Sequence, residues 1–265
     1  MILFVLEGKR REPAFFRTIE KLYFTGTESI ICSYCNNIYN LFKEMSKSDF
    51  QMDIASVLHE KWKGTESDPF GKTRKASDFS EVFLFFDYDC HQQDKKGLTT
   101  IKDLNRQLDK MLEFFSEETA NGKLYINYPM MESIRYTKKL PDNDYFSYEI
   151  PLKDVLRFKE LATNFSFYKN LDEICFKLNN EPRELSPEQE EKVKRNWELL
   201  VRQNVFKANF ICKGKNIKPS AKADGSQQAL FNKECHDFVS ARGTVSILNS
   251  FPLFLYEYFT VLINE

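Results

Sequence analysis

The first half of the chain alternates short apolar runs with segments in which apolar residues recur every three or four positions. The runs predict buried β-strands, and the recurring positions predict amphipathic helices. Because strands that alternate with helices form parallel βαβ units, this half predicts an α/β fold, a parallel sheet flanked by helices. The predicted strands are residues 2–6, 30–34, 81–87 and 124–127, and the predicted helices are residues 9–24, 38–45, 52–62 and 101–115.

From about residue 151 the pattern changes, and helical spacing replaces the alternation. This half is interpreted as a helical addition with one loop rich in Gly, Lys, Pro and Ser at residues 213–226. We therefore expect an α/β region over residues 1–150 and a C-terminal helical region over residues 151–265, two regions that can share one core. The predicted helices of this half are residues 155–161, 171–178, 187–206, 231–239 and 245–263.

Composition limits the class of protein without deciding its function. The 265 residues include 38 Lys and Arg against 39 Asp and Glu, so only local clusters of charge can indicate nucleic-acid binding. The six cysteines lack a disulfide-framework spacing, and the apolar N-terminus is too short for a signal peptide, so we expect a cytoplasmic protein with reduced thiols. The apolar stretch 246–263 contains Asn249, Pro252 and Glu257, which predicts a buried helix and no membrane span.

Acidic residues stand at the ends of two predicted strands. Glu7 follows the apolar run 2–6, and Asp87 and Asp89 follow the run 82–86. The carboxyl ends of parallel strands meet at one edge of the sheet, where open α/β sheets bind ligands. Residues two apart in a strand share a face, so the two aspartates can converge on one ion. Crowded carboxylates need a cation, and oxygen ligands favour Mg²⁺ or Mn²⁺, so the pattern predicts metal-dependent phosphate chemistry.

Three short motifs resemble one protein family. The segment from Glu7 to Phe16, Glu-Gly-Lys-Arg-Arg-Glu-Pro-Ala-Phe-Phe, resembles the opening of Toprim domains, most closely the RloB-like branch near the overcoming-lysogenization-defect nucleases. Asp87-x-Asp89 matches the second half of the Toprim signature, and Asn127 to Glu132 is similar to a strand ending in Asn-Pro with a glutamate soon after. The resemblance covers roughly residues 1–135. It departs from the family pattern at Arg11, where that branch usually has threonine.

The resemblance implies both an activity and a set of partners. Toprim proteins carry out metal-dependent phosphoryl transfer, so it implies an endonuclease that hydrolyses phosphodiester bonds of DNA or RNA, with tRNA among the candidates. It further implies a toxic effector of bacterial anti-phage defence, a homodimer, restrained by an ABC-type ATPase. This chain has no P-loop, so the ATPase is expected to be a separate subunit. The ligands that the resemblance implies for Mg²⁺ or Mn²⁺ are Glu7, Asp87 and Asp89, with Glu12 and Glu132 completing a second metal position.

Basic residues cluster in two predicted loops, at residues 63–80 and 213–226. Such clusters bind phosphate backbones, although a single loop lysine serves solubility at least as often. Lys207 follows an apolar helical stretch between two phenylalanines, and we expect it to offset charge in the transition state. The candidate nucleic-acid-binding residues are Lys72, Arg74, Lys75, Lys213, Lys215 and Lys218.

Two alternatives stay open at this point. A catalytically weak Toprim-like module that binds metal or nucleotide as a partner subunit would carry the same motifs, and metal-dependent cleavage by the purified chain separates the two interpretations. A zinc site from Cys32, Cys35, Cys90 and His91 is the other alternative. Free buried cysteines are favoured over it, because no second cysteine pair stands at zinc-finger spacing.

Overall fold

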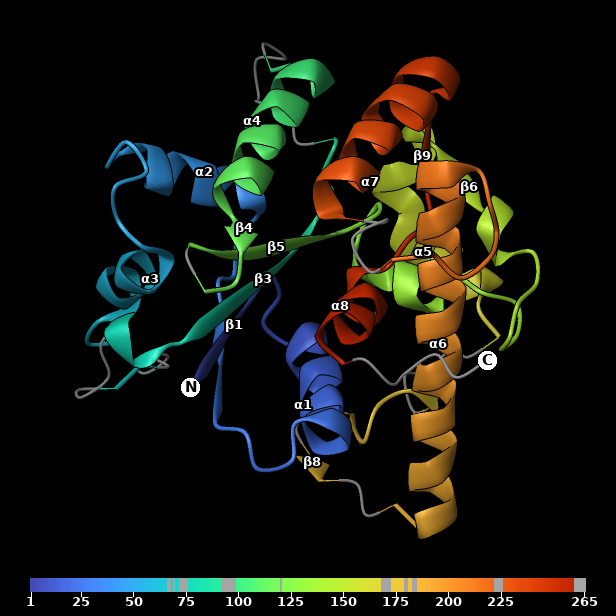
Figure 1. The fold of residues 1–265 in the computed structure, drawn as a ribbon, viewed down its shortest axis with the longest axis horizontal. Coiled ribbons are helices and arrows are strands. Elements are labelled where there is room, and N and C mark those ends of the chain that lie inside the picture. Colours follow the sequence, from blue (N-terminus) through green and yellow to red (C-terminus); the bar gives the residue numbers. More distant parts are fainter. Residues whose placement is uncertain are drawn as a thin grey trace.

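A mostly parallel five-stranded sheet lies at the centre of the fold in Figure 1, which confirms the predicted α/β class. The strand order is β2-β1-β3-β5-β4, and the edge strand β4 runs antiparallel to β5. The strands are β1 (Ile2–Leu6), β2 (Ser29–Ser33), β3 (Glu81–Asp87), β4 (Ser116–Glu117) and β5 (Gly122–Asn127). The computed structural model describes the chain apart from residues 66–67, 69, 72–75, 92–98, 120, 168–172, 179–180, 183–184, 222–225 and 260–265.

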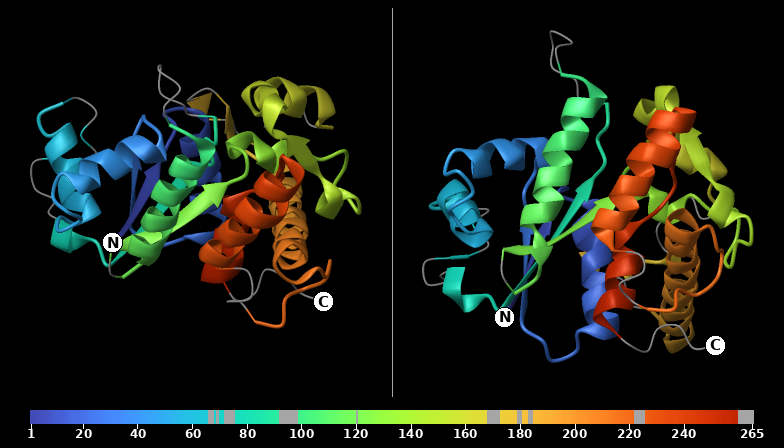
Figure 2. Two further views of the ribbon diagram at one scale, coloured as in Figure 1. Left: turned by 90° about the horizontal axis from the view of Figure 1, so that it is seen from above. Right: turned by 45° about the horizontal axis from the view of Figure 1, so that its top comes forward.

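Helices cover both faces of the sheet, as Figures 1 and 2 show. On one side lie α2 (Ile38–Ser46), α3 (Ile54–Trp62) and α4 (Ile101–Phe114). On the other side lie α1 (Arg11–Tyr23) and α8 (Ser250–Tyr258), so the last helix of the described residues packs beside the first.

Local sequence explains where the helices of the first half begin. At α4 the side chains of Thr100 and Asp103 form a capping box, and Leu104, Leu108 and Leu112 form its buried stripe. The strands β1, β2, β3 and β5 and the helices α1 to α4 match their predicted ranges to within about two residues, because signals of this kind are local.

Aromatic rings build the core between the sheet and its α1/α8 side. The ring of Phe4 on β1 lies 3.9 Å from that of Phe16 on α1, and Phe85 on β3 stacks at 4.5 Å on Phe251 of α8. Each aromatic pair contributes about 0.5–1.5 kcal/mol beyond its buried area. Buried apolar residues of both halves form one continuous cluster, so the C-terminal helix completes the core of the N-terminal sheet.

The long helix α6 (Pro187–Lys213) begins where the pattern predicts and ends later. Ser186 and Gln189 form its capping box, and the helix continues past residue 206. It stops at Gly214, whose φ of 69° lies in the left-handed region that glycine adopts at helix ends.

Short strands replace helix at two places in the second half. Lys177–Leu178 forms β7 and pairs with β8 (Glu181–Pro182), so the helix predicted at 171–178 is wrong in this described part. β9 (Thr244–Ser246) pairs antiparallel with β6 (Glu149–Pro151), so the last helix starts later than predicted. A short apolar run fits strand and helix equally well, and here tertiary pairing decides.

The remaining elements are short. They are the 3₁₀ segments η1 (Ala76–Asp78), η2 (Met131–Arg135), η3 (Tyr145–Ser147) and η4 (Leu152–Arg157), the helices α5 (Phe158–Phe165) and α7 (Gln227–Lys233), and the π-helix η7 (Glu234–Ser240). The pair η4 and α5 takes the place of the helix predicted at 155–161, and α7 with η7 takes that of 231–239.

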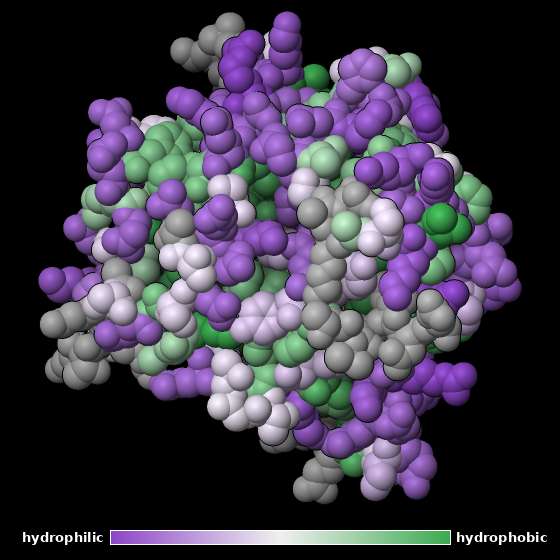
Figure 3. Space-filling model, in the orientation of Figure 1, coloured by the Kyte–Doolittle hydropathy of each residue, from purple (hydrophilic) through white to green (hydrophobic). Residues whose placement is uncertain are grey.

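Apolar residues are concentrated inside the molecule. The exposed large apolar side chains of the described chain, Leu156, Phe167 and Ile217, belong to three separate segments, and the face in Figure 3 is mainly hydrophilic. Among the described helices, none is long and apolar enough to cross a bilayer. The apolar C-terminal stretch is instead the core helix α8, in which residues 250–255 are buried.

Candidate functional site

The carboxyl ends of β1, β3 and β5 meet at one edge of the sheet. Glu7 directly follows β1, and Asp87 is the last residue of β3. Asn127, the last residue of β5, pairs with Asp87 in the sheet. The backbone N–H of Asp87 donates a hydrogen bond to the Glu7 carboxylate, with 3.0 Å from N to Oε2. The structure therefore brings together the two acidic strand ends that the sequence singles out.

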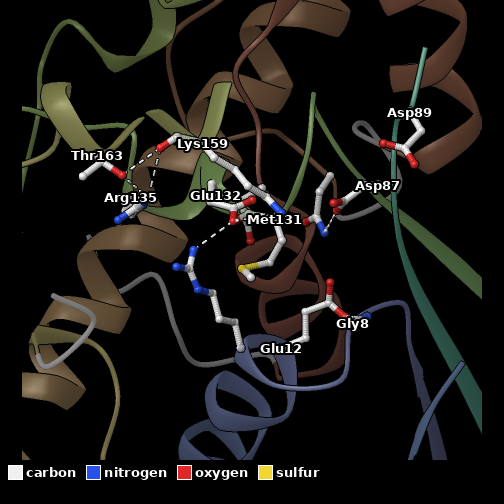
Figure 4. A network of polar contacts seen from close by, with 12 residues as sticks. Gly8, Glu12, Asp87, Asp89, Met131, Glu132, Arg135, Lys159 and Thr163 are labelled. Atoms are coloured by element: carbon white, nitrogen blue, oxygen red, sulfur yellow. Dashed lines mark hydrogen bonds and ion pairs between the residues drawn. The ribbon is translucent and has the colours of Figure 1, made fainter. Parts of the chain in front are cut away.

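A pocket of about 280 Å³ opens at this edge, and charged side chains of both signs line it. The less exposed of these charged side chains are carboxylates from separate elements and form the pocket floor, and the exposed ones are cations and form its rim. Figure 4 labels Glu12, Asp87, Glu132 and Lys159 from this lining. The carboxylates are those of Glu7, Glu12, Asp87 and Glu132. The cations are those of Lys9, Arg10, Arg11 and Lys159.

Glu12 reaches the floor through the tight turn between β1 and α1. Its carboxylate accepts a hydrogen bond from the backbone N–H of Gly8, and the Glu12 residue is only 4% exposed. A Cβ at position 8 would lie 3.1 Å from the carboxyl carbon of Glu12, so glycine is the residue that allows this close approach.

Glu132 comes from the 3₁₀ segment η2 and is held by two cations. Arg11 on α1 lies 3.0 Å from its Oε1, and Lys159 on α5 lies 3.7 Å from the same oxygen. Arg135, also on η2, donates to the backbone carbonyl of Lys159 and to Thr163 Oγ1, which ties α5 to the site (Figure 4). The site thus joins the N-terminal α/β half to a helix of the second half.

Asp89 does not join the pocket lining in the way that the Asp-x-Asp spacing predicts. Strand β3 ends at Asp87, and the N–H of Cys90 donates to the carbonyl of Tyr88 in a tight turn, so the alternation of a strand no longer applies. Asp89 is 8% exposed, stands apart from Asp87 in Figure 4, and has His91 Nε2 4.0 Å from its Oδ1.

Burial and mutual repulsion disfavour the charged forms of three of the floor carboxylates, those of Glu7, Glu12 and Asp87. Burial, reinforced by the charge of Asp89, raises the pKa of Glu7 to about 9. Burial raises the pKa of Glu12 well above its usual range, with Asp87 adding to the effect. The pKa of Asp87 is likewise raised by burial and by Glu7. A divalent cation between these groups would reverse this effect.

The donor set fits a hard cation, although the side chains are turned toward N–H groups. Within the described residues, no three His, Cys, Asp or Glu side chains are arranged to hold one ion, so the zinc alternative gains no support, and the cysteines there form no disulfide. Glu7, Glu12 and Asp87 instead accept hydrogen bonds from Asp87 N, Gly8 N and Asn127 Nδ2. Their oxygens are the ligand type that Mg²⁺ and Mn²⁺ prefer.

The raised pKa values predict how stability depends on pH without metal. Between about 4.5 and about 9 the folded state keeps a proton on Glu7 that the unfolded chain releases, so the free energy of unfolding falls as the pH rises. We expect the melting temperature in EDTA to fall across this range, and to fall less in Asp87→Asn, which lacks one repelling charge. Burial also shifts the pKa values of Lys207 and Glu234 into this range, so the wild-type profile alone does not report on the floor. The difference between wild type and Asp87→Asn isolates the contribution of the floor. Parallel pH profiles would contradict the repulsion.

Other candidate residues lie away from the pocket. Lys207 is buried and donates to the backbone carbonyl of Tyr145, at 3.3 Å, and to that of Tyr148, and burial lowers its pKa to about 7. It does not line the pocket, so its placement gives no support to a role at the reacting phosphate. The exposed lysines of the predicted loop 213–226, here called the loop lysines, are Lys213, Lys215 and Lys218, of which Lys213 is the last residue of α6. Lys72, Arg74 and Lys75 lie outside the described residues.

The loop after α6 packs at the far end of α8. The carbonyls of Lys215 and Ile217 accept hydrogen bonds from the side chain of Asn209, and Pro219 lines a small cavity with Glu257 near the end of α8. The opposite end of that helix touches β5 at the carboxyl edge through its first residue, so the loop lies away from the pocket.

Sequence reasoning misses Lys159 as a site residue. It is one of 38 basic residues and stands in a predicted surface helix, so no local signal separates it from the others. Comparison of the chain with protein-family models, with curated proteins and with solved structures gives no match. The fold and the site by themselves define a class: an α/β protein with a carboxylate-floored, cation-rimmed pocket at the carboxyl edge of a parallel sheet.

Proposed function

We propose that this protein is a Toprim-like, metal-dependent endonuclease that hydrolyses phosphodiester bonds of DNA or RNA. The observation that carries the proposal is the pocket, in which carboxylates form the floor and cations form the rim. The rim attracts the negative charge of a phosphodiester, and the floor needs a divalent cation before that charge can approach it. The two parts of the pocket together complement a metal-bound phosphate.

Each part of the pocket would have its own role. The pocket residues that would hold Mg²⁺ or Mn²⁺ are Glu7, Glu12, Asp87 and Glu132. Asp89 lies outside the pocket lining and stays a predicted ligand. When bound, the ion would polarise the phosphate and stabilise the charge that develops on its oxygens. Arg11 and Lys159 already contact one carboxylate oxygen of Glu132, and the same geometry would place them on a phosphate oxygen.

The direct test is cleavage by the purified chain. We expect plasmid DNA or total tRNA to be cut in Mg²⁺ or Mn²⁺ and to remain intact in excess EDTA. Absence of cleavage in both metals, with both substrates and with a folded protein, would contradict the proposal.

The rim predicts where nucleic acid binds. Within the described residues no ion pair holds Lys9 or Arg10, and both are exposed at the pocket. We expect the double variant Lys9→Ala/Arg10→Ala to weaken binding and to reduce the salt slope by about 0.7–0.9 for each phosphate that the variant no longer neutralises. Binding measured across a salt series checks this.

The loop lysines provide the matched comparison for the rim. Replacing Lys213, Lys215 and Lys218 together removes more positive charge from the surface, but at the far end of α8. We expect the triple variant to keep most of the salt slope. The opposite result would be loss of the salt slope in the triple variant with the slope retained in the rim variant. Nucleic acid would then bind at the loop lysines, as the sequence pattern predicts.

A second candidate function keeps the same pocket. The floor carboxylates accept hydrogen bonds from N–H groups, as they also would in a catalytically weak module that binds metal or nucleotide as a partner subunit. Metal binding by the purified chain without cleavage of nucleic acid would favour this second candidate function. The roles in anti-phage defence, the separate ABC-type ATPase and the homodimer rest on the resemblance, and they stay predictions.

A further inference from the structure

The side-chain amide of Asn127 is held in one orientation beside Asp87. Its Nδ2 donates to Asp87 Oδ1 at 3.1 Å, and its Oδ1 accepts from both the backbone N–H and the hydroxyl of Ser250, at 3.0 and 2.7 Å. Asn127 is 1% exposed and Ser250 is fully buried. Reversing the amide would set its NH₂ against the backbone N–H of Ser250 and its carbonyl against the Asp87 carboxylate, so the contacts of Ser250 favour the orientation in which NH₂ faces Asp87.

The neighbouring residue, Asn249, holds the segment that carries Glu132. Its Nδ2 donates to the carbonyl of Met131 at 3.1 Å and to Ser133 Oγ at 3.0 Å, the residues on either side of Glu132. Its Oδ1 accepts from the N–H of Phe251 and so caps α8. The backbone N–H of Asn249 in turn donates to Asn204 Oδ1 on α6.

We propose that Asn249 and Ser250, at the start of α8, are positioning residues for the metal site. Ser250 orients Asp87 through Asn127, and Asn249 fixes η2 and with it Glu132. One buried dipeptide therefore sets the spacing between two floor carboxylates that come from different elements. The inference rests on the proposed function only as far as the floor binds a divalent cation. Residues that orient metal ligands typically change metal affinity by about 10–100-fold when they are replaced.

The competing explanation for these hydrogen bonds is that Asn249 and Ser250 only cap α8. Three variants separate helix capping from a positioning role at the metal site. Ser250→Ala keeps the helix and the backbone N–H, and removes only the hydroxyl that holds Asn127. Ser246→Ala is the matched control, because Ser246 is also buried and its hydroxyl has no hydrogen-bond partner in the described chain. Asn249→Ser keeps a capping oxygen and removes the amide that bridges to η2.

Calorimetric titration of the full chain with Mn²⁺, together with thermal unfolding, tests the inference. We expect Ser250→Ala and Asn249→Ser each to weaken Mn²⁺ binding by roughly 10-fold, and Ser246→Ala to stay within about twofold of wild type. If Ser250→Ala fails to fold, the Mn²⁺ affinity of Asn249→Ser tests the inference. Unchanged Mn²⁺ affinity in the folded variants would overturn the inference, as would a wild-type chain that binds no Mn²⁺. Mn²⁺ binding without nucleic-acid cleavage would instead refute the endonuclease and leave the inference standing.

Discussion

Replacing Asp87 with asparagine is expected to abolish phosphodiester cleavage and to leave the fold intact. Asp87 ends the central strand β3 and hydrogen-bonds to both Glu7 and Asn127. An amide in its place cannot bring negative charge to the ion, and losing several kcal/mol of transition-state stabilisation lowers the rate by about 10³-fold. Initial cleavage rates in Mg²⁺, compared with wild type, measure the loss.

The same substitution should not lower stability in metal-free buffer. Burial and the charge of Glu7 raise the pKa of Asp87, so its ionised form is unfavourable in the fold, and removing it relieves repulsion. We expect the melting temperature in EDTA to hold or rise. The exposed Asp144 supplies the control, because Asp144→Asn should change neither rate nor stability. Full cleavage by Asp87→Asn would remove Asp87 from the site.

The fold of the first half was accessible from sequence because its signals are local and redundant. Strand β3 is an uninterrupted apolar run, and α4 carries both a capping box and an apolar stripe. The second half lacks such redundancy. The run at β9 is three residues long and becomes a strand only because β6 lies beside it, a pairing that local sequence does not contain.

The site residues likewise differ in whether local sequence could predict them. That Glu7 and Asp87 come together follows from parallel topology, which places the ends of adjacent strands at one edge. Asp89 lies outside the pocket lining because β3 ends two residues earlier and the alternation of a strand no longer applies there. Local sequence could not predict Lys159 and Ser250 as site residues, because each reaches the site through tertiary contacts. Ser250 lies 123 residues along the chain from Asn127, its hydrogen-bond partner.

Chelation of divalent cations is expected to remove all cleavage, and Mg²⁺ or Mn²⁺ should restore it. The pocket floor offers carboxylate oxygens, which suit these ions. Ca²⁺ takes more ligands in looser geometry, so we expect it to compete with Mg²⁺ without supporting turnover. An ion that binds only the folded state also stabilises it, by about 2.7 kcal/mol at 100 times its dissociation constant.

Metal-dependent cleavage and metal-dependent stabilisation have to agree if one ion at the pocket floor causes both. Because Glu7 must lose its proton to bind the ion, metal should raise the melting temperature more at pH 9 than at pH 6, opposite to the trend of the metal-free protein. Asp87→Asn should show little of this stabilisation. Cleavage that survives exhaustive EDTA treatment would rule out the mechanism, and stabilisation by Mg²⁺ equal in wild type and Asp87→Asn would place the ion somewhere other than the pocket floor.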